Sequence, residues 1–173
     1  MKHMSSRFWF LGLPWLLLSV GTAQSDFCQN NLPANNPDAF YIDHGDGTVT
    51  DTRTGLMWKQ CAEGLSGATC RTGSPHLFNW ANALPHAETS TFANYSDWRL
   101  PNVKELSSLV EKCRVSPAIN TNRFPNTPGF FFWSGSPHAG FSQWAWGVYF
   151  YAGAPFFFDR TGLNRVRLVR DEQ

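Results

Sequence analysis

The clearest pattern of apolar and polar positions in the chain follows the stretch YSDWRLPNVKEL, residues 95–106. Pro101 has no backbone N–H and disfavours helical geometry at Leu100, so a helix is expected to begin after it. Asn102 is a preferred N-cap residue, and Glu105 three residues later completes a capping-box pattern. Apolar residues then recur at helical spacing and predict one buried stripe: Val103, Leu106, Val110 and Cys113. The positions expected to face water are Ser107, Ser108, Glu111 and Lys112.

The residues just before this helix are interpreted as structural. We expect Trp98 to lie in the core, Arg99 to be fixed by hydrogen bonds, and Pro101 and Asn102 to start the helix. The alternative is that Arg99 contacts a ligand.

Strand patterns occur on both sides of the helical region. Residues 40–61, FYIDHGDGTVTDTRTGLMWKQC, predict a β-hairpin with Asp-Gly at its tip and a further strand. The segment LFNWANAL predicts another helix, which Pro85 is expected to kink or end. Four aromatic or alternating segments predict the closing strands: FFFWS, WAWGVYF, PFFF and NRVRLVR. Strands at both ends with two helices between them indicate an α+β domain.

The N-terminus has the pattern of a signal peptide. Lys2 and Arg7 precede an apolar run, and small residues follow at 21–23. Cleavage after Ala23 would leave a single domain of 150 residues, 24–173 (173 − 23 = 150). An uncleaved anchor is the alternative, but a membrane span needs about 20 apolar residues and Pro14 interrupts this run. We therefore expect a secreted or periplasmic protein without a membrane span after cleavage.

Four cysteines follow the predicted cleavage site, and an even number in an oxidising compartment indicates disulfides. Cys61 and Cys70 enclose a short glycine-rich loop, so we expect them to pair, which leaves Cys28 for Cys113. Zinc binding is the competing interpretation, but no histidine or CxxC spacing supports it.

Charge is distributed unevenly between the two parts of the chain. Residues 24–113 carry 6 basic and 10 acidic side chains, whereas residues 114–170 carry six arginines and a single acid, Asp159. The second segment also holds 14 of the 27 aromatic residues. Arginine binds carboxylates and sulfates bidentately, and aromatic faces stack on rings, so this segment is the candidate ligand surface. The alternatives are that the aromatics form core and that Arg165, Arg167 and Arg170 line a solvated strand face.

Motifs for catalysis and metal binding are weak. Asp43, Asp46 and Asp51 surround a glycine-rich turn that could hold calcium, but the bidentate Glu of an EF-hand loop is missing and turn formation explains them sufficiently. The histidines at 44, 76, 86 and 138 lie among turn and loop residues without a nucleophile at a recognisable spacing. We expect no enzyme activity, no cofactor, no metal and no nucleic-acid partner.

Seven segments in order resemble the Lcl C-terminal domain family of bacterial exported domains: GDGTVTDTRTGLMWKQC, FNWANAL, YSDWRLPNVKELSSLVEKC, PAINTNRFPNTP, FWSGSP, AWGVYF and VRLVR. The resemblance runs from about Asp43 to Arg170 and implies a C-type-lectin-like domain, with two helices and an irregular C-terminal ligand region. The RLPN..E stretch is also similar to a helix start of the formylglycine-generating enzyme superfamily. Cysteines 61, 70 and 113 stand where the family often has them. No collagen-like segment precedes the domain, so the resemblance implies no oligomeric state.

The function expected from these observations is non-enzymatic recognition of an anionic, sulfated glycan or another surface ligand, as in an adhesin. The candidate ligand-binding residues are Arg123, Trp144, Arg160 and Arg165. A protein–protein module of a cell-envelope or pilus assembly is the first alternative. An enzyme of the formylglycine-generating type is the second, although it would need cysteine chemistry late in the chain and none follows Cys113.

Overall fold

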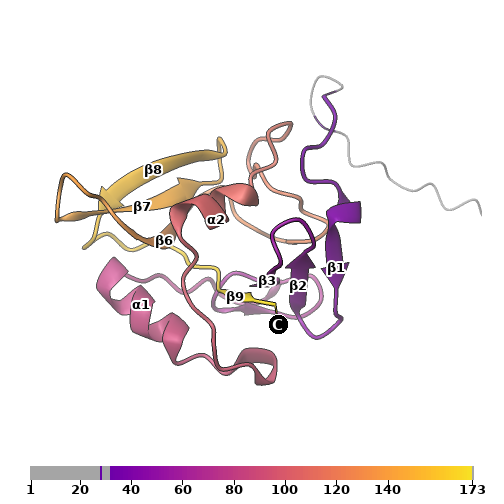
Figure 1. The fold of residues 1–173 in the computed structure, drawn as a ribbon, viewed down its shortest axis with the longest axis horizontal. Coiled ribbons are helices and arrows are strands. Elements are labelled where there is room, and N and C mark those ends of the chain that lie inside the picture. The colour runs from indigo at the N-terminus through magenta and orange to yellow at the C-terminus, as the bar shows by residue number, and fades with distance from the viewer. Residues whose placement is uncertain (1–27, 29–31, 173) are drawn as a thin grey trace, which may run out of the picture.

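The computed structural model describes residue 28 and residues 32–172 (Figure 1). The predicted signal peptide, residues 1–23, lies outside the described residues. None of the helices in the described part has the length and apolarity that crossing a membrane requires.

The first sheet joins the two ends of the domain. Its antiparallel strands lie in the order β1-β2-β3-β9: β1 (Tyr41–Asp43), β2 (Thr48–Asp51), β3 (Leu56–Lys59) and β9 (Val169–Asp171). The predicted hairpin is confirmed, with Tyr41 opposite Asp51 and Asp43 opposite Val49. Trp58 pairs with Val169, so β9, the last strand of the described residues, lies next to β3 at one edge of this sheet.

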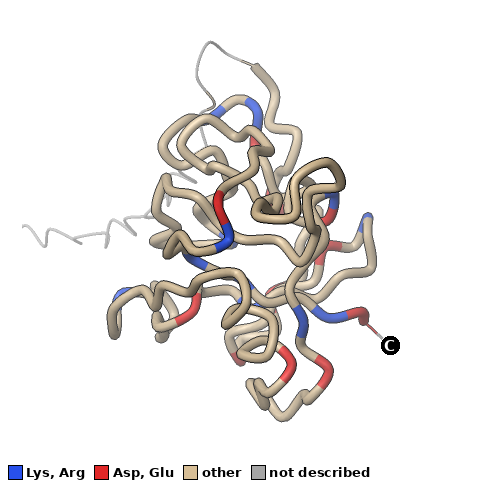
Figure 2. The backbone as a smooth tube through the Cα atoms, turned by 90° about the vertical axis from the view of Figure 1, so that its left-hand side faces the viewer, with Lys and Arg blue, Asp and Glu red and all other residues tan. Residues whose placement is uncertain are grey.

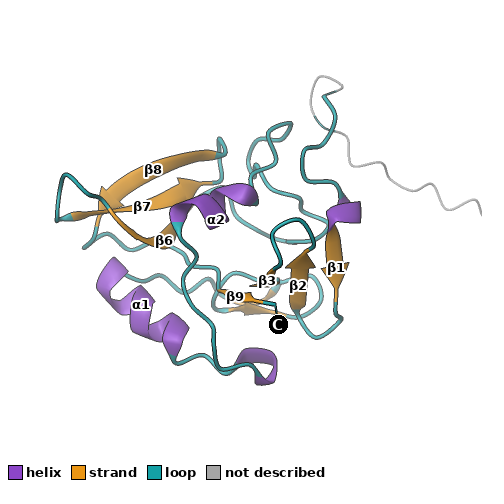
Figure 3. Ribbon diagram, in the orientation of Figure 1, coloured by secondary structure: helices purple, strands orange, loops and turns teal. Residues whose placement is uncertain are grey.

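The second major sheet is built from the aromatic segments, in the order β6-β7-β8. Its strands are β6 (Phe131–Pro137), β7 (Trp144–Tyr149) and β8 (Ala154–Asp159), all antiparallel. A two-stranded ribbon, β4 (Leu65–Ser66) with β5 (Thr72–Gly73), lies in the Cys61–Cys70 region. Long loops connect these elements, as Figure 3 shows, together with two short 3₁₀ turns, Asp38–Phe40 and Phe92–Asn94.

Strand β6 lies between two apolar clusters because alternate residues of a strand point to opposite faces. On one face Phe132 packs in a cluster with Leu106 and Leu109 from the region of α2 (Val103–Ser108). On the other face Phe131 and Trp133 belong to a cluster that includes Ala83 and Ala87 of α1 (Trp80–Glu88) and Trp98.

The predicted start of α2 is confirmed in detail. Asn102 Oδ1 accepts from the N–H groups of Lys104 and Glu105 (both 2.9 Å), and the Glu105 carboxylate accepts from Asn102 N–H (2.7 Å). Trp98 is 1% exposed, and Arg99 is held by Glu105 and Asp171. These contacts match the structural interpretation of the motif.

Helix α2 ends earlier than the sequence pattern predicts. α2 ends at Ser108, and Val110 instead forms a β-bridge with Ile119. Helical periodicity therefore does not govern Glu111, which is buried rather than solvated and accepts from the N–H groups of Asn35 and Asn36.

In α1, Pro85 does not end the helix, because Thr89 N–H donates to Pro85 O (3.0 Å) at its C-terminus. Pro85 is solvent-exposed, and α1 continues past it to Glu88, with Ala87 buried.

Both predicted disulfides are present: Cys28–Cys113 and Cys61–Cys70. The zinc interpretation is therefore wrong, since no cysteine is free. The predicted α+β class, with two helices, short antiparallel strands, long loops and two disulfides, is confirmed.

Candidate functional site

The β6–β8 sheet becomes progressively more exposed from β6 to β8. β6 is covered on both faces, and its outer edge is bridged by Arg165, which pairs with Phe132. β8 pairs only with β7, and most of its residues are exposed. In Figure 1, β8 is the outermost strand of this sheet.

One face of this sheet carries a groove of about 520 Å³. Strand register explains its composition, because paired residues on neighbouring strands share a face: Phe131 pairs with Tyr149, and Gly147 pairs with Phe156. A Cβ on Gly147 would meet the Phe131 ring at 2.5 Å, so glycine lets that ring lie against β7. The lining residues are Phe130, Phe131, Tyr149, Ala154, Phe156, Phe158, Leu163, Asn164 and Arg165.

Arg165 supplies the positive charge of this groove. Its guanidinium carbon lies 4.1 Å from the centre of the Phe130 ring. Its Nε is buried without a hydrogen-bond partner, and no acid of the described residues forms an ion pair with it. Desolvation lowers the pKa of Arg165 from its ordinary value. An anion in the groove would therefore stabilise a cation for which the described residues provide no acidic partner.

The opposite face of the β7–β8 hairpin holds a second aromatic cluster. Trp144 stacks on Phe157 with ring centres 4.7 Å apart, and His138 stacks on Trp146 at 5.3 Å. Trp144 is half-buried, and Phe157 covers one side of its indole. The sequence predicts His138 only as a loop residue, whereas the structure packs its ring against Trp146 and Phe157.

Arg160 and Arg123 have partners inside the domain. Arg160 Nε donates to Trp144 O (3.1 Å), and the guanidinium lies 4.2 Å from the Trp80 ring centre. Arg123 lies in the loop before Phe124, where its Nε is 3.8 Å from Asp38 Oδ1. The structure thus brings Trp144 and Arg160 together, places Arg165 in the groove, and leaves Arg123 outside the groove lining.

The idea that Arg165, Arg167 and Arg170 line a solvated strand face is wrong. Arg167 is 0% exposed and Arg170 is 5% exposed. Arg170 Nε donates to Asp97 (2.7 Å), and its guanidinium lies over Tyr95. The physical reason is that β9 begins only at Val169, so the preceding residues follow no single strand alternation.

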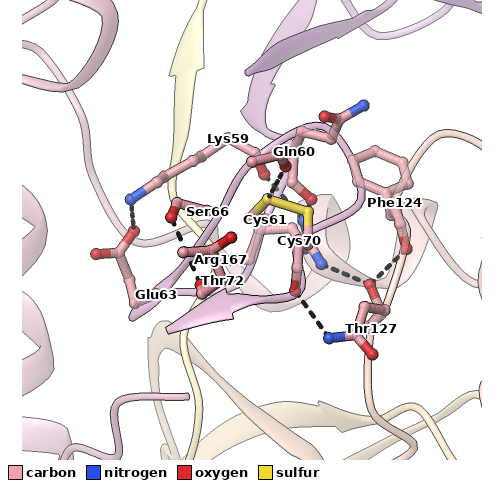
Figure 4. The surroundings of a disulfide bond; sticks show 12 residues. Lys59, Gln60, Cys61, Glu63, Ser66, Cys70, Thr72, Phe124, Thr127 and Arg167 are labelled. Carbon is pink, nitrogen blue, oxygen red and sulfur yellow. Dashed lines mark hydrogen bonds and ion pairs between the residues drawn. A yellow bond between two sulfur atoms is a disulfide. The ribbon is translucent and has the colours of Figure 1, made fainter. Parts of the chain in front are cut away.

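Arg167 is a structural cation beside the Cys61–Cys70 disulfide (Figure 4). It donates to Lys59 O (2.9 Å), Gln60 O and Thr127 Oγ1 (2.7 Å), and it lies over the Phe124 ring. Desolvation lowers the pKa of Arg167 to about 9, opposed by the charge of Glu63.

The burial of Arg167 and Arg170 reduces the positive charge available to a ligand. Figure 2 shows basic and acidic positions scattered over the chain, several of them close together. The six arginines of residues 114–170 therefore do not form one continuous basic surface.

The acidic turn serves local structure. Asp43 accepts from Gly45 N–H, Asp46 accepts from Thr48, and Asp51 is buried in an ion pair with Arg53 (3.0 Å). A hollow of about 350 Å³ lies between this turn and the Cys61–Cys70 loop, with Lys59 and Phe92 in its lining. Lys59 is occupied by Glu63, at 2.6 Å. Among the described residues, the metal-ligand types that converge closely are Cys28, Glu111 and Cys113, and the two sulfurs are bonded to each other.

Sequence reasoning missed Phe130, Tyr149 and Leu163 as groove residues. The aromatic run 156–158 is evident in the sequence, but the pairing that sets Phe156 and Phe158 on the face of Tyr149 depends on the register of β7 with β8. A one-residue change of register would have sent the opposite set of side chains to this face.

The fold and site together define a disulfide-bonded α+β domain with an exposed aromatic face and no free thiol. A comparison with protein families matches residues 47–170 to the Lcl C-terminal domain, and the chain belongs to that family. A search of curated proteins found no match.

Proposed function

We propose that this protein is an exported, non-enzymatic recognition domain that binds an anionic polysaccharide, such as a sulfated glycan, in the groove of the β6–β8 sheet. The observation that carries the proposal is Arg165, a cation without an acidic partner among the described residues, at an apolar groove. A sulfate or carboxylate would accept charge-assisted hydrogen bonds from it.

The rest of the groove suits a ligand made of rings. Phe130 and Phe156 are each 53% exposed, and Phe158 is 47% exposed. Aromatic side chains present broad apolar faces with few rotatable bonds, so they offer contact area at low entropic cost. A sulfated polysaccharide carries sugar rings with anionic groups attached. The rings would pack on the aromatic residues of the groove, and one anionic group would bind Arg165.

The disulfides support export and argue against cysteine-based catalysis. Disulfides persist in oxidising compartments, which agrees with a secreted or periplasmic location. An oxidase of the formylglycine-generating type needs a redox-active thiol, and all four cysteines are bonded. Mass spectrometry of the native protein without a reducing agent can test this. If it finds all four cysteines in disulfides, the enzyme alternative is removed.

The test is retention on heparin and on dextran sulfate as salt is raised. Arg165→Ala should weaken binding about tenfold, the loss expected for one charge-assisted hydrogen bond. Arg71→Ala is the matched control, because Arg71 is exposed, lies outside the groove and removes the same charge. Equal losses in both variants would show non-specific charge attraction and contradict the groove.

A second comparison tests the aromatic contribution. Tyr149→Ala should weaken retention, whereas Phe141→Ala, at an exposed position outside the groove, should not. Absence of salt-sensitive retention by the unaltered domain, with one stoichiometric envelope protein co-purifying, would instead favour the protein–protein alternative.

A further inference from the structure

The open edge of β8 adjoins the groove, because Phe156 and Phe158 of this strand also line it. Arg160 N–H donates to Gln143 O (2.9 Å) at the end of the β7–β8 pair. Because hydrogen-bonded residues alternate along an antiparallel pair, Phe158 and Phe156 also direct their N–H groups toward β7. Phe157 and Asp159 therefore direct theirs to the open edge, where no other strand of the described residues pairs with them.

We propose that β8 pairs with β8 of a second copy of this chain, antiparallel and centred on Phe157, to form a two-fold symmetric dimer with a continuous six-stranded sheet. In this register Phe157 lies opposite Phe157 of the other copy, and Asp159 lies opposite Pro155. The inference does not depend on the nature of the ligand.

The hydrogen-bonding groups of the edge are self-complementary in this register. The two Phe157 residues exchange two N–H···O bonds, and each Asp159 N–H can donate to Pro155 O of the other copy. Pro155 has no N–H to offer in return. The carbonyl opposite Pro155, that of Asp159 in the other copy, does not lack a donor, because it already accepts from Gly162 N–H of its own chain at 2.9 Å. Four backbone hydrogen bonds form between the two copies. The outward-facing carbonyls of Pro155, Phe157 and Asp159 then all accept a hydrogen bond.

The side chains of the same register are also compatible. Phe156 would lie directly opposite Phe158 of the other copy on the groove face, while each Phe157 ring would keep its stacking on Trp144 on the opposite face. Cross-strand aromatic pairs stabilise antiparallel sheets. Asp159 is the one charged residue of β8, and in this register the two copies of Asp159 lie four residues apart along the strands. That separation is roughly 13 Å, beyond the Debye length at physiological salt.

The area agrees with a weak dimer. A phenylalanine side chain buries about 150–250 Å², so covering the exposed halves of Phe156 and Phe158 in both copies removes roughly 400 Å². Phe157, Pro155 and the strand backbones would bring the total to roughly 800 Å², below the 1,200 Å² or so of a standard stable interface. We therefore expect association in the micromolar to millimolar range.

The pairing is closed rather than open-ended. The outer edge of β6 is already bridged by Arg165, whose N–H donates to Phe131 O and whose carbonyl accepts from Trp133 N–H. Extension of the sheet is therefore possible at β8 alone, and a two-fold contact at one edge gives a dimer, not a fibre. The two-fold axis stands perpendicular to the sheet, so both grooves lie on the same face. Dimer formation covers the exposed halves of Phe156 and Phe158, so a ligand of the dimer would contact the rest of the groove lining, which includes Phe130, Tyr149 and Arg165.

Sedimentation velocity without ligand, over a range of protein concentration, is the first test. The unaltered domain should shift from monomer to dimer as concentration rises. In hydrogen exchange, the amides of Phe157 and Asp159 should gain protection with concentration, while those of Phe156 and Phe158 are protected throughout. A domain that remains monomeric to its solubility limit, or edge amides that exchange at a constant rate, would overturn the proposal.

A pair of double variants tests the register. Phe156→Lys/Phe158→Lys places like charges opposite each other and should abolish the dimer. Phe156→Lys/Phe158→Glu places each Lys opposite a Glu of the other copy and should associate at least tenfold more tightly than the double-lysine variant. Phe141→Lys is the control, because Phe141 is 50% exposed and lies outside β8. Equal association of the two double variants would show the register to be wrong, provided circular dichroism shows both to be folded; should either unfold, the amide measurement on the unaltered domain decides.

Discussion

Arg99 and Glu105 form a two-pronged ion pair, with Arg99 Nη1 2.8 Å from one carboxylate oxygen and Nη2 3.0 Å from the other. The same carboxylate accepts from Asn102 N–H. Arg99 therefore orients the side chain that completes the cap of α2, and its own backbone pairs with Val169. Through its side chain and its backbone together, Arg99 links the start of α2 to β9.

Arg99→Ala should lower the free energy of unfolding by about 1–2 kcal/mol, because it removes the ion pair and loosens the cap. Glu105→Gln should cost less, since the amide can still accept from Asn102 N–H. Urea titration of both variants measures this, and the folded fraction of Arg99→Ala should still be retained on heparin. Normal stability together with lost retention would make Arg99 a ligand contact.

Arg167→Met should be severely destabilising, by about 3 kcal/mol or more. The thioether cannot donate to Lys59 O, Gln60 O or Thr127 Oγ1, and stranded buried acceptors each cost about 1–3 kcal/mol. Arg123→Met is the matched control at a half-buried arginine and should cost much less. Urea midpoints that fall equally for the two variants would contradict the structural role of Arg167.

The Asp97–Arg170 pair should contribute to stability in a pH-dependent way. The hydrogen bond from Arg170 holds the pKa of Asp97 below its ordinary value of 3.8. Because the folded-state pKa is the lower one, this stabilisation is present above about pH 4 and is lost as pH falls through the folded pKa. Asp97 is substantially exposed, so the effect should be modest.

The measurement is the melting temperature of Asp97→Asn and of the unaltered domain. At pH 7 the variant should melt slightly lower, and the difference should shrink as the pH falls toward 2. A difference that stays constant with pH would show that the carboxylate charge of Asp97 is not its source.

Removal of the Cys28–Cys113 disulfide should have a larger entropic effect than removal of Cys61–Cys70. The sequence separations are 85 and 9 residues, for which chain-entropy estimates give about 4.6 and about 2.6 kcal/mol. Denaturant unfolding of the two double-alanine variants compares them. Cys61 and Cys70 also belong to the main apolar cluster, which Cys28 and Cys113 do not, so their loss removes packing there as well. A larger loss of stability from the Cys61–Cys70 pair would show packing to dominate.

Binding should be divided unequally among the arginines. Arg165→Ala should weaken retention on dextran sulfate most, since Arg165 alone of the predicted residues lines the groove. Arg160→Ala and Trp144→Ala should have smaller effects, and Arg123→Ala should resemble Arg71→Ala. A dominant loss from Arg123→Ala would move the ligand surface to the loop beside Asp38.

The start of α2 could be predicted because its causes are local. Pro101, Asn102 and Glu105 lie within five residues of one another, and their backbone chemistry acts at that range. The hairpin tip at Asp46–Gly47 and the short Cys61–Cys70 loop were predictable for the same reason. The end of α2 was not, because the bridge from Val110 to Ile119 competes with the last helical turn.

The arginines illustrate what local reasoning misses. Arg167 appears in the sequence as a polar residue between Val166 and Leu168, yet carbonyls more than 100 positions away surround it. Likewise, the groove brings together residues from β6, β7, β8 and the segment after β8, and their common face follows from strand register rather than from composition.

The pairing of β3 with β9 makes folding of the domain depend on its last residues. Met57 lies opposite Arg170, a separation of 113 positions, so the first sheet stays incomplete until residues 169–171 have been made. Contacts of such long range slow folding, because a large loop must close before they form. Loss of residues 166–172 would also strip Val166, Arg167 and Leu168 from the interior. A chain truncated by these few residues should therefore fail to fold as a whole, and limited proteolysis of nascent fragments should find no protected N-terminal half.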